Sequence, residues 1–199
     1  MPTLRFPGAR TDTTLLTQAL ADARVRPGAR VLDLGTGSGP AAAAREGAAE
    51  VVAIERCRRA VLSARLNGSL RRLPVRAFRG DPAGRGRLGR FDVVLANPPY
   101  VPGPDGRRYL DPLCARARDL LARQGTLLML HSSLCDPAAT LTELRRQRLR
   151  AGVVARQLVP FNPVLHGQKR YLERAGLIEP GQDFEEVLVI RADRSGCAA

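Results

Sequence analysis

A short apolar strand that opens directly into closely spaced glycines constrains the fold of this chain most. Residues 31–34 form an apolar run that contains Asp33, and Gly35, Gly37 and Gly39 follow at alternate positions. Glycine has no side chain, so this turn can bend sharply and allow a ligand to touch the backbone. A strand, a glycine turn and a helix in this order are typical of doubly wound α/β folds, which bind nucleotides at such turns.

Further apolar runs of strand length continue along the chain. They predict strands at residues 51–54, 74–78, 91–96, 126–130, 153–159 and 186–190. Capping residues and amphipathic patterns predict helices that begin at Asp12 or Thr13, Pro40, Arg58, Asp111 and Asp136. Glycines are predicted to end three of these helices, at Gly68, Gly125 and Gly152. Strands that alternate with helices indicate one mostly parallel sheet covered on both faces.

Length and composition are those of a single globular domain. With 199 residues and 44% hydrophobic content, the chain can bury a full α/β core, and no linker divides it. We therefore expect one domain over residues 1–199, with a core at about 11–192 and short tails. There is no run of 18 apolar residues and no apolar leader, so a cytosolic protein without membrane contact is expected. The four cysteines have no C-x-x-C spacing, so neither a metal site nor a disulfide framework is predicted.

The net charge of +13 raises the question of a nucleic-acid partner. The basic residues are nearly all arginine, with Lys169 as the only lysine, and they are spread along the whole chain. This usage is typical of a GC-rich genome that encodes arginine at solvated positions. Nucleic acid is therefore a possible partner but is not favoured.

Acidic residues at three successive strand ends indicate which nucleotide-like ligand the glycine turn binds. The spacing differs from the G-x-G-x-x-G fingerprint of dinucleotide sites, and Asp33 would repel a pyrophosphate. Asp33 instead suits the cationic amino group of S-adenosylmethionine. Glu55 is placed to accept hydrogen bonds from two ribose hydroxyls, and Asp81 to accept one from the adenine amine.

The segment Asn97-Pro98-Pro99-Tyr100 follows the strand at residues 91–96. Two prolines fix the backbone in an extended shape, so the Asn97 amide oxygen and the Pro98 carbonyl become fixed acceptors. These acceptors can hold an N–H₂ group with its lone pair facing a methyl donor, and Tyr100 offers an aromatic wall. Transfer of an activated methyl group requires mainly positioning and electrostatics. The segment therefore predicts N-methyl transfer, with Asn97, Pro98 and Tyr100 as catalytic residues.

Taken together, these motifs resemble class I S-adenosylmethionine-dependent methyltransferases with a Rossmann-like fold. Within that class, the chain is similar to the HemK-type protein-glutamine methyltransferases, in the short branch that lacks an N-terminal helical domain. The resemblance implies a seven-stranded sheet whose last strand is antiparallel. It implies that Asn97 to Tyr100 hold the substrate. The cofactor contacts that it implies, together with the glycine turn, are Thr13, Asp33, Gly35, Gly37, Glu55, Asp81, Pro82 and Asn97.

The chain departs from that family in three places. The helix after Gly39 is short, Glu55 replaces the usual aspartate, and the loop after Tyr100 lacks a longer segment that helps to hold the glutamine. The acceptor is expected to be a protein glutamine, with a small metabolite or the exocyclic amine of a nucleic-acid base as alternatives. A non-catalytic cofactor-binding subunit is a third class. Residues 161–172, within an insert at 160–183, are interpreted as a lid or an extra surface helix, and the residues do not determine a homodimer or a partner subunit.

Overall fold

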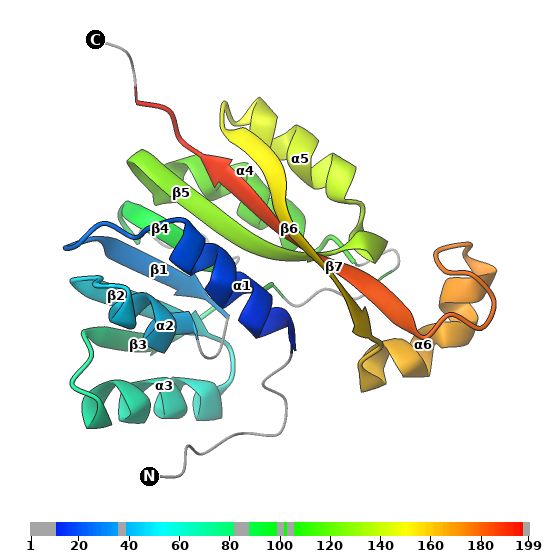
Figure 1. The fold of residues 1–199 in the computed structure, drawn as a ribbon, viewed down its shortest axis with the longest axis horizontal. Coiled ribbons are helices and arrows are strands. Elements are labelled where there is room, and N and C mark those ends of the chain that lie inside the picture. Colours follow the sequence, from blue (N-terminus) through cyan, green and yellow to red (C-terminus); the bar gives the residue numbers. More distant parts are fainter. Residues whose placement is uncertain (1–10, 36–38, 82–87, 99–101, 103–105, 197–199) are drawn as a thin grey trace.

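A single seven-stranded sheet forms the centre of the molecule (Figure 1). The structure, a computed structural model, describes residues 11–35, 39–81, 88–98, 102 and 106–196, with the backbone alone at 11–13 and 39–41. The strand order is β3-β2-β1-β4-β5-β7-β6. The strands are β1 (Arg30–Leu34), β2 (Glu50–Glu55), β3 (Val75–Arg79), β4 (Phe91–Ala96), β5 (Leu121–Ser132), β6 (Arg150–Pro160) and β7 (Phe184–Asp193).

The first five strands are parallel to one another, and β7 is antiparallel to both of its neighbours, β5 and β6. The predicted seven-stranded, mostly parallel sheet with an antiparallel last strand is therefore confirmed. Each predicted strand lies within an observed strand, except residues 74–78, which are shifted by one residue from β3. The predicted and observed ends of β4 are the same.

Helices cover both faces of the sheet. One face packs against α1 (Thr11–Asp22), α2 (Gly39–Arg45) and α3 (Arg58–Leu70), and the other against α4 (Leu110–Leu120) and α5 (Pro137–Arg146). A 3₁₀ turn, η1 (Ser133–Cys135), connects β5 to α5. Within the described residues, none of the helices combines the length and apolar character that a membrane span requires.

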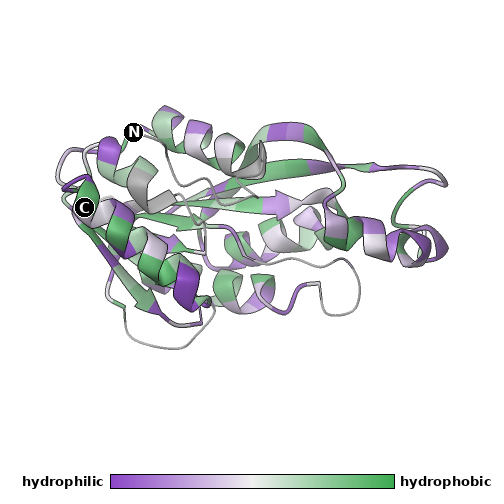
Figure 2. Ribbon diagram, turned by 90° about the horizontal axis from the view of Figure 1, so that it is seen from below, coloured by the Kyte–Doolittle hydropathy of each residue, from purple (hydrophilic) through white to green (hydrophobic). Residues whose placement is uncertain are grey.

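Alternation along each strand produces two apolar layers, seen in Figure 2 as the hydrophobic colour of the sheet between the helices. In β1, Val31 belongs to the layer under α1 and α2, whereas Leu32 and Leu34 belong to the layer under α4. All three side chains are almost fully buried. Because β1 is buried on both faces, its carboxyl end is a rigid base for the residues that follow it.

The three glycines predicted to end helices do not do so. Gly68 is buried inside α3, where its missing side chain allows close approach to Val75, and Gly125 and Gly152 lie inside β5 and β6. Arg72 and Arg148, at φ 52° and 57°, supply the left-handed turns that follow α3 and α5. α4 instead runs directly into β5, with Leu121 in an extended conformation at its end. The predicted start of α5 is confirmed, since Asp136 accepts a hydrogen bond from the Ala139 N–H at 3.0 Å.

The insert between β6 and β7 folds as a helix, α6 (Pro163–Arg174), which begins after the capping residue Asn162. The two strands extend beyond the rest of the sheet and carry α6 at their far end (Figure 1). A separate apolar cluster stabilises this unit and includes Phe161, Leu165, Leu172 and Ile178, with Leu134 of η1 packed against it. Of the two interpretations of residues 161–172, the structure shows the additional helix.

Gly125 is expected to tolerate no side chain. A Cβ at this position would lie 2.9 Å from the Phe91 carbonyl oxygen and 3.0 Å from the Ala122 nitrogen, and backbone atoms in a sheet cannot move away cheaply. Gly125→Ala should therefore lower the free energy of unfolding by about 1–3 kcal/mol in urea titrations.

Gly152→Ala is the matched control, because a Cβ there has no neighbour within 4 Å. We expect its free energy of unfolding to stay within about 0.5 kcal/mol of wild type. Equal stability of the two variants would contradict the close packing of β4 against β5.

Candidate active site

The carboxyl ends of β1 to β4 meet at one edge of the sheet, where ligands of open α/β folds bind. Backbone hydrogen bonds continue past the strands at this edge, from N–H groups to carbonyl groups: Asn97 to Leu34 at 3.0 Å, Gly35 to Ile54 at 3.1 Å, and Gly80 to Glu55 at 3.0 Å. These bonds hold in one row the four segments that carry the predicted site residues.

Two of the three predicted acidic residues are buried at this edge. Asp33 is fully buried and Glu55 is 8% exposed, whereas Asp81 is exposed. Asp33 is paired in register with Ala53, and Glu55 lies two residues beyond Ala53, so both carboxylates point to the face covered by α1, α2 and α3. Their roles toward a cofactor stay predictions.

The glycine turn begins as predicted. Gly35 has φ +75°, a left-handed conformation that a side chain would strain, so the chain turns sharply directly after β1. Thr13 lies in α1, and only its backbone is described. Four further predicted residues lie outside the described part of the chain, namely Gly37, Pro82, Pro99 and Tyr100.

The predicted acceptor motif, residues 97–100, begins next to this turn. Asn97 is half-buried, Pro98 is buried, and the Asn97 N–H is bonded to the residue before Gly35. The structure thus brings the motif of the fourth strand within one strand spacing, about 4.8 Å, of the glycine turn. Buried carboxylates beside a sharp backbone turn suit a ligand with a cationic amine and ribose hydroxyls, which is the chemistry of S-adenosylmethionine.

Sequence reasoning missed the role of Arg107, which lies between the acceptor motif and α4. Its Nη1 donates to the carbonyl oxygens of Cys135 and Asp136, both at 2.8 Å, and to Thr140 Oγ1 at 3.1 Å. Its Nη2 lies 2.7 Å from the Asp111 carboxylate. Arg107 therefore ties the residues before α4 to η1 and to the start of α5. Only the Asp111 contact is local, and the contacts with η1 and α5 are made 28 to 33 residues along the chain, where no sequence pattern marks them.

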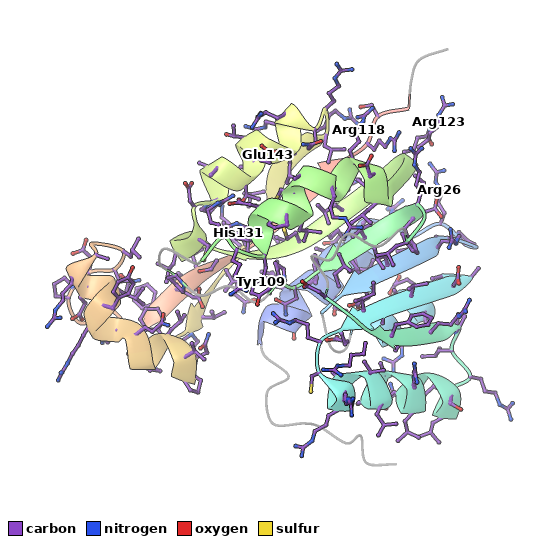
Figure 3. The ribbon with its side chains drawn as sticks, turned by 180° about the vertical axis from the view of Figure 1, so that it is seen from behind. Arg26, Tyr109, Arg118, Arg123, His131 and Glu143 are labelled. Carbon is purple, nitrogen blue, oxygen red and sulfur yellow. The ribbon has the colours of Figure 1, made fainter. Side chains whose placement is uncertain are left out.

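His131, labelled in Figure 3, is fully buried and shares the Thr140 hydroxyl with Arg107. Its Nδ1 lies 2.7 Å from the Ser132 carbonyl oxygen and its Nε2 2.9 Å from Thr140 Oγ1. Since Nδ1 faces an acceptor, it carries the proton, and the Thr140 hydroxyl donates to Nε2 while it accepts from Arg107. Burial lowers the pKa of the imidazole, against the opposing effect of the Ser132 carbonyl. Both ring nitrogens of His131 are thus used in contacts within the protein, which indicates a structural residue.

The described cysteines form no metal centre. Burial raises the pKa of Cys114 to about 12 and that of Cys135 to about 11, so both thiols stay protonated. Cys57 is exposed at the start of α3, where backbone N–H groups of Ala60 and Arg59 lower the pKa of its thiol. Within the described residues, no cluster of three or more histidine, cysteine or acidic side chains could hold a metal.

Comparison with known proteins shows a family. The model of the methyltransferase small domain matches residues 8–151. A protein of Methanocaldococcus jannaschii, named as a protein N5-glutamine methyltransferase, is 30% identical over 173 residues, which are 77% of this chain and 86% of that protein. The release factor glutamine methyltransferase of Deinococcus radiodurans is 33% identical over 188 residues. That match includes 92% of this chain and spans 64% of the Deinococcus enzyme's length.

A solved structure shows the same fold. The Mtq2–Trm112 complex of E. cuniculi, which is named for methylation of the termination factor eRF1, contains a chain that superposes with a TM-score of 0.64. The identity is 23%, and the match covers 96% of this chain and 98% of that chain.

The lowered pKa of His131 predicts a pH dependence of stability. The unfolded chain binds a proton on this histidine below about pH 6.5, and the folded chain binds it only at a lower pH. The free energy of unfolding should therefore fall as the pH falls below that value, with a contribution of up to about 1.4 kcal/mol per pH unit. Urea titrations between about pH 7.5 and pH 5.5 measure this slope.

His131→Gln should remove that contribution to the slope, whatever it does to the stability at neutral pH. The control is His166→Gln, at an exposed histidine of α6, which should keep the wild-type slope. Parallel slopes for wild type and His131→Gln would show that the buried imidazole takes up a proton in the folded state.

Proposed function

This chain belongs to the methyltransferase small domain family of S-adenosylmethionine-dependent methyltransferases, and we propose that it methylates the side-chain amide nitrogen of a glutamine in a protein. Its relatives in M. jannaschii and D. radiodurans, named for glutamine methylation, support this acceptor. A translation release factor is the protein substrate to test first, because the Deinococcus relative is named for it.

The backbone hydrogen bond from Asn97 to Leu34 carries the proposal. It holds the start of the acceptor motif beside Gly35, where the cofactor turn begins. A methyl donor on the turn and an amide on the motif would therefore meet at neighbouring strand ends. Holding the methyl donor and the amide next to each other makes their reaction effectively unimolecular, and this lowers the barrier to methyl transfer.

The chain's own residues would act mainly by positioning. S-adenosylmethionine, when bound, supplies a methyl group on a positively charged sulfur. The Asn97 side-chain oxygen and the Pro98 carbonyl oxygen would each accept a hydrogen bond from one N–H of the substrate glutamine's amide. The nitrogen lone pair then faces the methyl group, the N–C bond forms as the C–S bond breaks, and one amide proton leaves to water. Glu55 and Asp81 would hold the ribose and adenine, and the buried Asp33 the charged end of the cofactor.

The test is transfer of labelled methyl from S-adenosylmethionine to the purified release factor of the source organism. Label should appear on the protein, and replacement of the methylated glutamine by asparagine should abolish it. Asn97→Ala should reduce single-turnover transfer at least about a hundredfold, because it removes a fixed acceptor while the fold persists. Asn67→Ala is the control and should keep full activity, because the Asn67 side chain lies on α3 and donates a hydrogen bond to Ser63 of the same helix.

Other outcomes would separate the alternatives. The same transfer can be measured in an extract of the source organism. Label only in the RNA fraction would identify a base amine as the acceptor, and label only in the small-molecule filtrate would identify a metabolite. Either result would exclude the protein glutamine. Unchanged transfer by Asn97→Ala would remove Asn97 from the reaction.

Glu55 is expected to bind the cofactor independently of any acceptor. Glu55→Ala should weaken S-adenosylmethionine binding by about 1.5–3 kcal/mol, the range for hydrogen bonds to a charged group. Calorimetric titration measures the dissociation constant. Glu50→Ala changes the opposite end of β2, where the carboxylate pairs with Arg30 and Arg76, and should leave binding unchanged. An equal dissociation constant for wild type and Glu55→Ala would place the ribose elsewhere.

A further inference from the structure

Residues 106–109 form a turn that joins the acceptor motif to α4, and we call it the strap. The motif begins at Asn97, and residues 98–105 lead from it to the strap. Two side chains of the strap make long-range contacts: Arg107 with Cys135 of η1, which follows β5, and Tyr109 with Arg56, which follows β2. The strap is therefore fixed to both sides of the edge at which the site lies.

Tyr109 provides the contact with β2. The Arg56 guanidinium donates a hydrogen bond to the Tyr109 hydroxyl, and its central carbon lies 4.8 Å from the centre of the ring. A cation over an aromatic face is attracted by the ring's quadrupole, so the two contacts favour the same geometry. The hydrogen bond to Tyr109 raises the pKa of Arg56, and the charge of Asp81 acts in the same direction.

Arg56 directly follows Glu55, the predicted ribose ligand, so the positions of the two residues are coupled through the backbone. Its own carbonyl accepts a hydrogen bond from Arg79 Nε at 3.4 Å, near the end of β3. Tyr109 is therefore attached to the part of the edge where Glu55 and Asp81 lie.

The sheet order shows what lies between the two contacts of the strap. Tyr109 contacts Arg56, which directly follows β2, and Arg107 contacts η1, which follows β5; strands β1 and β4 lie between β2 and β5 in the sheet. Gly35 follows β1 and Asn97 follows β4. Arg107 and Tyr109 thus reach to either side of the two strand ends between which methyl transfer is proposed.

We propose that Tyr109, held by Arg56, is a positioning residue for methyl transfer, which fixes the chain after Asn97 to the strand that carries Glu55. This inference rests on the proposed function. Its physical reason is that the acceptor oxygens must be held to within a fraction of an ångström, which a segment tied only at Asn97 does not provide. The same contact couples the two ligands, since it joins the strand of the cofactor to the segment of the acceptor. Coupling of this kind is reciprocal, so each ligand strengthens binding of the other.

The kinetic test uses Tyr109→Phe, which keeps the ring, and Arg56→Met, which keeps the length of the side chain without its charge. Each should lower the single-turnover rate on the acceptor protein by about tenfold, and the double variant should lose no more than either single variant. The dissociation constant of S-adenosylmethionine without acceptor should change less than the rate. A purely structural role predicts instead a lower melting temperature with an unchanged rate.

Tyr171→Phe is the matched control, because Tyr171 is 44% exposed on α6, away from the strap. It should keep the wild-type rate. Additive losses in the double variant, or a rate for Tyr109→Phe within about twofold of wild type, would overturn the positioning role.

A second measurement tests the link between the strap and the cofactor in the absence of an acceptor. The chain has three tyrosines and no tryptophan, so its ultraviolet emission comes from tyrosine alone. S-adenosylmethionine added to the wild type should change this emission, and Tyr109→Phe should remove at least half of the change, whereas Tyr171→Phe should not. A response that Tyr109→Phe leaves intact would overturn the link between strap and cofactor. If release factor is not methylated but this response is seen, the proposed acceptor fails and the strap stands.

Discussion

The hydrogen bond between Asn97 and Leu34 is the contact on which the arrangement of the site depends. It joins the last residue of β1 to the first residue after β4, so the parallel pairing of the two strands continues one residue past β4. β1 is buried on both faces, so its end cannot shift without disturbing two apolar layers. Gly35 and Asn97, the residues that directly follow β1 and β4, are therefore held in place by the core.

The sequence predicted those parts of the molecule that local patterns determine. Apolar runs located every strand, and because parallel strands end at one edge, they also placed Asp33, Glu55 and Asn97 together. Helix ends were predicted less well. Glycine is a common helix stop, but sheet pairing places Gly125 and Gly152 in strands. α4 runs directly into β5, and Arg148 turns the chain after α5.

Contacts made by long side chains could not be predicted. Tyr109 and Arg56 are 53 positions apart, and their contact depends on the order in which the strands lie in the sheet. The same is true of Arg107 and the carbonyl groups of Cys135 and Asp136, which lie between β5 and α5. The spacing of residues along the sequence does not predict such contacts. Arginine reaches them because its planar fork can satisfy several acceptors at once, which makes it more than a solvated charge here.

The position of β7 has a consequence for how the chain folds during synthesis. β7 is the last strand along the chain, yet it lies between β5 and β6 and supplies the hydrogen bonds that join them. A ribosome adds about 5–20 residues per second, so β5 has an unpaired edge until residues 184–193 emerge. The half of the sheet from β3 to β5 needs no later strand. The half that carries Gly35 and Asn97 can therefore form early on the nascent chain, and β7 completes the other half once residues 184–193 have emerged.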